Sequence, residues 1–167
     1  MNPQMNESEI KASLPKKIYR VDWRNPIGKG GQKQVYMANV EGYDLPLVLK
    51  IIFPSTDSLE RIKREIRAVE CIQHENIPQV IESNVDSVTD SSQIVWLLEE
   101  RVHGQSLRTI IQNRYAFTLK NIVEFLNVML SVLEVTEKNN IVHRDIKPDN
   151  IMLDDEGKYW LLDFGIA

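Results

Sequence analysis

Residues 143–150 read His-Arg-Asp-Ile-Lys-Pro-Asp-Asn, and this stretch decides the fold expected for the chain. The tripeptide Asp-Phe-Gly follows at 163–165, thirteen residues after Asn150. Between the two motifs, apolar residues at 151–153 and 159–163 surround a polar turn at 154–157, which predicts two short strands. The two polar motifs therefore flank a predicted hairpin.

The chain before residue 143 predicts strands with one inserted helix, followed by a mainly helical region. Strands are expected at 19–27, 34–40, 45–53, 78–85 and 93–100, and helices at 106–113 and 119–138. The inserted helix follows Asp57, and its apolar face is formed at helical spacing by Leu59, Ile62, Ile66, Val69 and Ile72. We therefore predict an α+β chain with a flexible polar tail at 1–17, a first lobe at 18–102 and a second lobe at 103–167.

The composition is typical of a soluble globular protein, with 43% hydrophobic and 26% charged residues. The net charge of −4 comes from mixed acidic and basic residues, which gives no argument for binding nucleic acid or a membrane surface. Cys71 is the only cysteine, and no apolar run reaches the roughly 18 residues that span a bilayer. The first 17 residues also lack the apolar core of a signal peptide, so a cytoplasmic location is expected.

Two charged residues interrupt apolar patterns. Lys50 lies within the nearly continuous apolar strand at 45–53, where a buried charge is costly unless it is paired. Glu65 falls inside the apolar arc of the helix that follows Asp57, so its side chain is expected to point towards the body of the domain. Both positions therefore predict a partner in the interior.

From about residue 18 to residue 167 the sequence resembles the eukaryotic-type Ser/Thr protein kinases. The resemblance rests on the stretch at 143–150, the Asp-Phe-Gly tripeptide, Lys50, Glu65 and a glycine-rich segment at 27–35. It implies a five-stranded antiparallel N-lobe with one helix, joined to an incomplete, mainly helical C-lobe. It also implies an enzyme that transfers the γ-phosphate of Mg-ATP to a serine or threonine hydroxyl of a protein substrate, with ATP and Mg²⁺ as its cofactors.

The same resemblance implies a role for each polar residue of the two motifs. Asp145 accepts or orients the proton of the substrate hydroxyl, and Lys147 contacts the γ-phosphate and favours serine or threonine acceptors. Asn150 and Asp163 supply hard oxygen ligands, which suit Mg²⁺. His143 is expected to pack in the interior and not to act as a catalyst or a ligand.

In the first lobe, the resemblance gives Lys50 two partners, the α- and β-phosphates of ATP and the carboxylate of Glu65. Gly28 and Gly30 belong to a loop whose backbone N–H groups approach the phosphates. Lys33 departs from the family pattern, because it stands at the third glycine position. A lysine there either adds positive charge near the phosphates or stiffens the loop.

The adenine ring is expected to lie among apolar side chains and against a backbone hinge. The residues at the lining positions are Val35, Val48, Met152 and Leu162, and Ile27 at the start of the glycine-rich segment is also expected to bind the nucleotide. The hinge runs from Glu100 to Val102, and its backbone would bond the edge of the adenine. The gatekeeper position before the hinge is either Glu99 or Leu98, depending on the register of the strand.

Two other classes of protein remain open. One is a kinase-derived fold that binds a nucleotide or a partner without transferring phosphate; Lys33 and the early end of the chain favour it. The presence of every catalytic polar group disfavours it: Lys50, Glu65, Asp145, Asn150 and Asp163. The other is a small-molecule kinase such as the aminoglycoside phosphotransferases, which usually lack a lysine at the position of Lys147.

The chain stops at Ala167, two residues after the Asp-Phe-Gly tripeptide. In the family the activation segment, the Ala-Pro-Glu motif and further helices come later. We therefore expect this sequence to be part of a longer kinase, and we expect the helix at 119–138 to expose apolar side chains.

Overall fold

The computed structural model describes residues 7–30 and 32–164, and their contacts divide the chain into two units. The first unit holds the described residues up to Arg67 and residues 80–101, and the second holds residues 68–79 and those from Val102 onwards. The second unit thus begins close to the expected lobe boundary, but it also takes in the segment that ends α2 and follows it.

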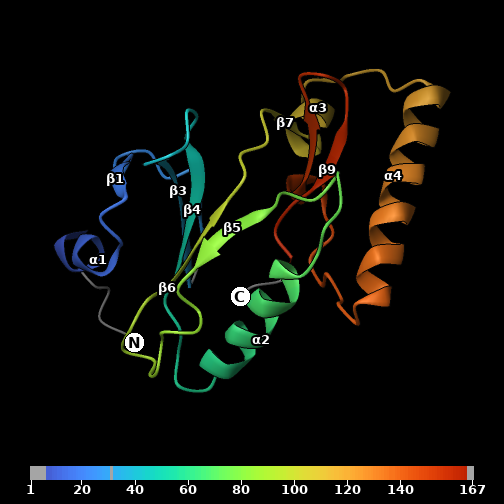
Figure 1. Ribbon diagram of the computed structural model, residues 1–167. Coiled ribbons are helices and arrows are strands. Elements are labelled where there is room, and N and C mark those ends of the chain that lie inside the picture. Colours follow the sequence, from blue (N-terminus) through green and yellow to red (C-terminus); the bar gives the residue numbers. More distant parts are fainter. Residues whose placement is uncertain (1–6, 31, 165–167) are drawn as a thin grey trace. The chain divides into compact units, whose positions relative to one another are not determined.

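The first unit is built on an antiparallel sheet with the strand order β1-β3-β4-β6-β5 (Figure 1). The strands are β1 (Ile18–Val21), β2 (Gly28–Lys29), β3 (Lys33–Val40), β4 (Leu47–Ile52), β5 (Val80–Ser83) and β6 (Val95–Glu99). The two-residue β2 adds to β3 alone. The predicted five-stranded antiparallel sheet is therefore confirmed along this path.

One face of this sheet is covered by a helix that the sequence analysis did not anticipate. Residues 1–17 were assigned to a flexible tail, whereas Glu7–Ser13 form α1, which lies beside β1 (Figure 1). Ile10 of α1 is buried in the same apolar cluster as Leu49 of β4 and Leu98 of β6. A helix of seven residues is not stable alone, so this packing is what holds it.

The inserted helix α2 (Leu59–Glu70) confirms the predicted apolar face. The predicted side chains are all buried: Leu59, Ile62, Ile66, Val69 and Ile72, the last of them just beyond the helix. Oε2 of Glu65 is buried as well, which confirms that this carboxylate points inward.

The second unit holds a three-stranded antiparallel sheet in the order β7-β8-β9. Its elements are β7 (Gly104–Ser106), α3 (Leu107–Gln112), α4 (Leu119–Lys138), the 3-10 turn η1 (Pro148–Asn150), β8 (Ile151–Asp154) and β9 (Tyr159–Leu161). The hairpin β8–β9 was predicted, and β7 was not. Asn76, which is buried, ties the segment after α2 to this sheet: its amide donates to the Tyr159 carbonyl (2.8 Å) and its carbonyl accepts from the Leu161 N–H (2.9 Å).

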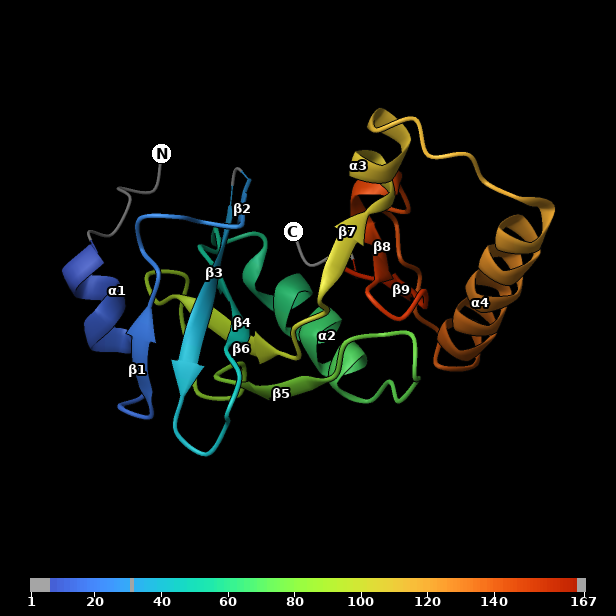
Figure 2. The same cartoon turned by 90° about the horizontal axis from the view of Figure 1, so that it is seen from above.

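Helix α4 begins and ends at the predicted residues. Thr118 caps it through a reciprocal pair of hydrogen bonds with Asn121, which satisfies backbone donors at the first turn. The helix lies alongside β9 (Figure 2), and the rings of Phe125 and Tyr159 meet edge to face with centroids 5.4 Å apart. Met129 and Val132 are buried, whereas the following apolar side chains are exposed, as expected: Leu119, Ile122, Val123, Leu126, Leu130 and Leu133. In the described part of the chain, none of the helices is long and apolar enough to cross a membrane.

Gly104 permits the close approach of β7 to β8. A Cβ atom at this position would lie 2.2 Å from the Leu153 carbonyl oxygen, so the backbone of one strand would have to move. We predict that Gly104→Ala lowers the free energy of unfolding by about 1–3 kcal/mol, measured by urea denaturation.

Gly157→Ala is the control for this prediction. Gly157 also has a positive φ (86°), but a Cβ there would meet no atom within 4 Å. Its replacement by alanine should lower the free energy of unfolding by only about 1 kcal/mol, the cost of a positive φ for a residue other than glycine. Equal losses for the two variants would contradict the steric explanation.

Candidate active site

The polar residues of the stretch at 143–150 converge on one carboxylate. Oδ2 of Asp145 accepts a hydrogen bond from Lys147 Nζ (2.7 Å) and another from Asn150 Nδ2 (2.9 Å). The same amide nitrogen also donates to the Asp145 carbonyl (2.8 Å). Three of the predicted site residues therefore form one hydrogen-bonded group, with Asn150 fixed at the end of η1.

The backbone of Leu162 anchors this group to the segment that precedes the Asp-Phe-Gly tripeptide. Its N–H donates to the Asn150 carbonyl, and its carbonyl accepts from His143 Nε2, both at 2.8 Å. Nδ1 of His143 accepts from the Asp145 N–H (3.3 Å), and the ring lies 4.6 Å from that of Phe164. His143 is buried, which confirms its predicted role in packing.

Two residues of the site have a left-handed backbone. Arg144 has φ = 64° and Asp163 has φ = 56°. Such a conformation costs a residue other than glycine roughly 1–2 kcal/mol, and aspartate tolerates it better than arginine does. The bond between His143 and the Leu162 carbonyl anchors the residue that precedes each of them, and this anchoring offsets the cost.

Within this group, Lys147 and Asp145 each favour the ionised form of the other. The hydrogen bond from Lys147 is the main cause that holds the pKa of Asp145 below its ordinary value; partial burial opposes it and Asn150 adds to it. The pKa of Lys147 is raised, first by Asp145 and further by the negative charges of Asp149 and Asp163. Both side chains therefore stay ionised at neutral pH.

The donor set fits the Mg²⁺ ion that the family resemblance implies. Both of these hydrogen bonds from the Asn150 side chain use Nδ2, so its amide oxygen is the atom that can bind a cation. Asp163 supplies a carboxylate, and Mg²⁺ prefers such oxygen ligands. The carboxylate of Asp149 has a structural role instead. It accepts a hydrogen bond from the guanidinium of Arg108 on α3 (3.1 Å) and so attaches η1 to that helix. No pattern in the sequence indicated this pair.

Lys50, the predicted phosphate-binding lysine, has a partner that the sequence analysis did not assign. Its Nζ lies 2.6 Å from Oε2 of Glu99, and the two side chains are only 6% and 9% exposed. In the β4–β6 register, Glu99 stands opposite Val48, two positions from Lys50 on the same face. Leu98 lies on the other face, in the cluster beneath α1. Of the two residues left open for the gatekeeper position, Glu99 is the one that faces Lys50.

The glycine-rich segment forms the start of a hairpin. Gly28 pairs with Val35, and the Gly30 N–H donates to the Lys33 carbonyl (2.8 Å). Lys33 is the first residue of β3 and pairs with Ile52, so this position has the backbone of a regular strand and does not require glycine. Gly31 lies outside the described residues.

The predicted site residues as a whole fall into two sets, one in each unit. The first unit holds Ile27, Gly28, Gly30, Val35, Val48, Lys50, Glu65 and Glu100, and the second holds Val102, Asp145, Lys147, Asn150, Met152 and Asp163. Val35 is buried, Val48, Val102 and Met152 are half-buried, and Ile27 and Glu100 are exposed.

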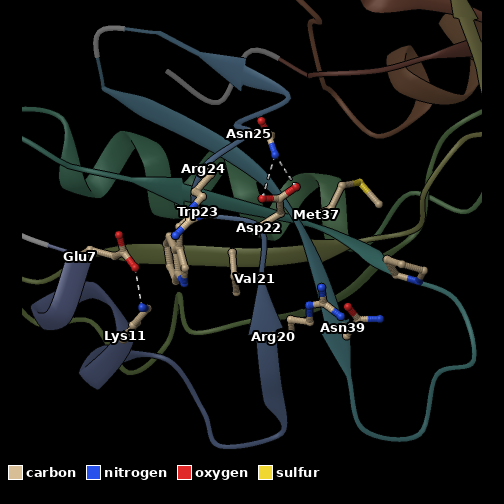
Figure 3. A pocket seen from close by; sticks show the side chains of 11 residues that line it. Glu7, Lys11, Arg20, Val21, Asp22, Trp23, Arg24, Asn25, Met37 and Asn39 are labelled. Carbon is tan, nitrogen blue, oxygen red and sulfur yellow. Dashed lines mark hydrogen bonds and ion pairs between the residues drawn. The ribbon is translucent and has the colours of Figure 1, made fainter.

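A hollow of about 770 Å³ lies elsewhere in the first unit, between α1, β1 and β3 (Figure 3). None of the predicted site residues lines it. Both acidic residues of its lining have a polar partner, since Glu7 pairs with Lys11 and the Asn25 amide donates to Asp22 (3.1 Å). The hollow is therefore separate from the predicted site residues of the first unit.

The model of the protein kinase domain family matches residues 22–167. The chain belongs to this family. Its described kinase features, the group around Asp145 and the buried Lys50, lie within the matched range. The resemblance inferred from the motifs is thus confirmed, and so is the kinase-like α+β fold.

Curated relatives of this kinase chain are named as serine/threonine-protein kinases. It is 31% identical over 149 residues to the probable serine/threonine-protein kinase PknB of Bifidobacterium longum, and 29% identical over 145 residues to PrkC of Bacillus subtilis. Each alignment covers 84% of this chain and 22% of the relative. PknA of Mycobacterium tuberculosis is 29% identical, with 34% of its length covered. The chain thus spans about a fifth to a third of these kinases.

The hydrogen bond between Lys147 and Asp145 should determine how the Asp145 carboxyl titrates in this kinase chain. Lys147→Ala should raise the pKa of the Asp145 carboxyl, because it removes the largest cause of the lowering. Carboxyl ¹³C NMR over a pH series measures this pKa directly. A carboxyl with a lowered folded-state pKa stabilises the fold at neutral pH, and this contribution disappears as the pH falls through that pKa.

Arg108→Ala is the matched control. It removes the partner of Asp149 in the same segment but no donor to Asp145. The Asp145 titration should then stay as in the unmodified chain. A pKa that does not change in Lys147→Ala would show that the ion pair is absent in solution.

Proposed function

We propose that this chain is the ATP-binding and catalytic-loop part of a Ser/Thr protein kinase, which transfers the γ-phosphate of Mg-ATP to a hydroxyl group of a protein. The observation that carries the proposal is the hydrogen-bonded group of Asp145, Lys147 and Asn150, anchored through Leu162. Phosphoryl transfer depends mainly on positioning and on neutralising charge, and this group is suited to both.

Asp145 is the residue that receives the acceptor hydroxyl. Lys147 and Asn150 both donate to Oδ2, so Oδ1 is the oxygen that takes the proton of a serine or threonine hydroxyl. Because its pKa is lowered, Asp145 remains a carboxylate at neutral pH and orients the hydroxyl as a hydrogen-bond acceptor before any proton moves.

The two lysines carry positive charge to the phosphates. Lys147 is half-exposed, and its three N–H donors allow it to keep its bond to Asp145 while it contacts a γ-phosphate. Lys50, on the buried strand β4, binds the α- and β-phosphates. Asn150 and Asp163 would hold the Mg²⁺ ion, which would neutralise charge on the phosphates.

The acceptor is a protein, and the reaction takes place in the cytoplasm. The relatives are named as serine/threonine-protein kinases, which supports a serine or threonine acceptor. The single cysteine, Cys71, is exposed and forms no disulfide, which agrees with a reducing compartment.

Replacing the carboxylate by an amide tests the proposal. Asp145→Asn should reduce transfer of labelled γ-phosphate to casein by about 100-fold or more, because the hydroxyl loses its charged acceptor. The affinity for Mg-ATP should stay the same, and phosphoamino acid analysis of the product should show phosphoserine or phosphothreonine.

Asp149→Asn is the matched control, since it changes the same chemical group in the same loop but only disturbs the bond to Arg108. It should transfer phosphate at nearly the unmodified rate. A chain that binds Mg-ATP and transfers nothing would be a nucleotide-binding module, and equal transfer by Asp145→Asn would remove Asp145 from the mechanism.

A further inference from the structure

The ion pair between Lys50 and Glu99 joins two neighbouring strands. Lys50 of β4 stands opposite Leu97 of β6, and Glu99 is two residues further along β6 on the same face. The atoms Nζ and Oε2 lie 2.6 Å apart, the length of a strong charge-assisted hydrogen bond. The pair is therefore a diagonal link across the sheet and not a surface contact.

Burial makes each charge depend on the other. The two side chains are almost fully buried. Removing one member of a buried pair leaves an uncompensated charge, whereas exposed pairs contribute little. The position of the Glu99 carboxylate therefore determines the position of the Lys50 ammonium group.

Glu99 is also held more rigidly than a residue on a helix. Its strand β6 lies between β4 and β5, and Glu99 pairs with Val48 on one side and with Val80 on the other. Glu65, the expected partner of Lys50, is on α2, and a helix is attached to a sheet only through its side chains. The carboxylate on β6 therefore has the more fixed position.

We propose that Glu99 is a positioning residue for Lys50: it fixes the ammonium group in the place where that group binds nucleotide phosphate. An ammonium has three N–H donors, so a bond to Glu99 and a bond to phosphate can be made by the same group. The inference rests on the proposed function, in which Lys50 binds the phosphates of ATP.

The test is a double-mutant cycle on the affinity for Mg-ATP, measured by calorimetry with the full chain. Glu99→Gln keeps the shape of the side chain and removes its charge, and it should weaken binding by about tenfold. In the Lys50→Met background the same substitution should not weaken binding further, because Glu99 acts only through Lys50. A merely structural role would weaken binding equally in both backgrounds.

Two further variants keep the test decisive. If Glu99→Gln does not fold, Glu99→Asp keeps the charge on a shorter side chain and should weaken binding less, again only where Lys50 is present. Glu82→Gln on β5 is the control: it removes the ion pair with Lys17 in the same sheet and should leave the affinity unchanged.

Three results would overturn the inference while leaving the proposed function intact. They are an unchanged affinity in Glu99→Gln, a tighter affinity, which would mean that Glu99 competes with the phosphates, and a loss that persists in Lys50→Met, which would mean that Glu99 contacts the nucleotide itself. If the unmodified chain does not bind Mg-ATP at all, the proposed function fails, and the inference fails with it.

Discussion

The two hydrogen bonds made by the backbone of Leu162 are the constraint on which the candidate active site depends. Its N–H and its carbonyl face the catalytic segment, one towards the Asn150 carbonyl and the other towards His143. Because Asp163 follows directly, the same backbone fixes both the segment that carries Asp145 and the start of the Asp-Phe-Gly tripeptide. A buried histidine at 143 and left-handed residues at 144 and 163 are the local features that this arrangement requires.

Each unit places a lysine against a carboxylate, but the two pairs differ in their physical character. The pair of Lys147 and Asp145 is about half-exposed, so solvent screens it and it contributes little to stability; its value is to keep both groups charged and oriented. The pair of Lys50 and Glu99 is almost fully buried, so it cannot be broken without leaving a charge in the interior. One pair is adjustable, as suits contact with a substrate, and the other is fixed.

The sequence predicted those features that local patterns control. Helix α4 was placed correctly because Thr118 provides a cap and the apolar run follows it directly. The inward direction of Lys50 and Glu65 was predicted because each of them interrupts an apolar pattern. The pairing of Lys50 with Glu99 was not predicted, because it depends on the register between two strands about fifty residues apart, and a shift by one residue would bring Leu98 to that face instead. Helix α1 was missed for a similar reason, since one apolar residue, Ile10, becomes significant only when the sheet is present to bury it.

Thermal unfolding with and without Mg-ATP tests the central claim most directly, which is that these residues form a nucleotide site. A ligand at about 100 times its dissociation constant should stabilise the chain by about 2.7 kcal/mol. This stabilisation should require Mg²⁺ and should be lost in Asp163→Asn, a variant chosen because asparagine tolerates the left-handed backbone at this position. An unfolding temperature that does not respond to Mg-ATP, or that responds equally without Mg²⁺ and in Asp163→Asn, would contradict the account.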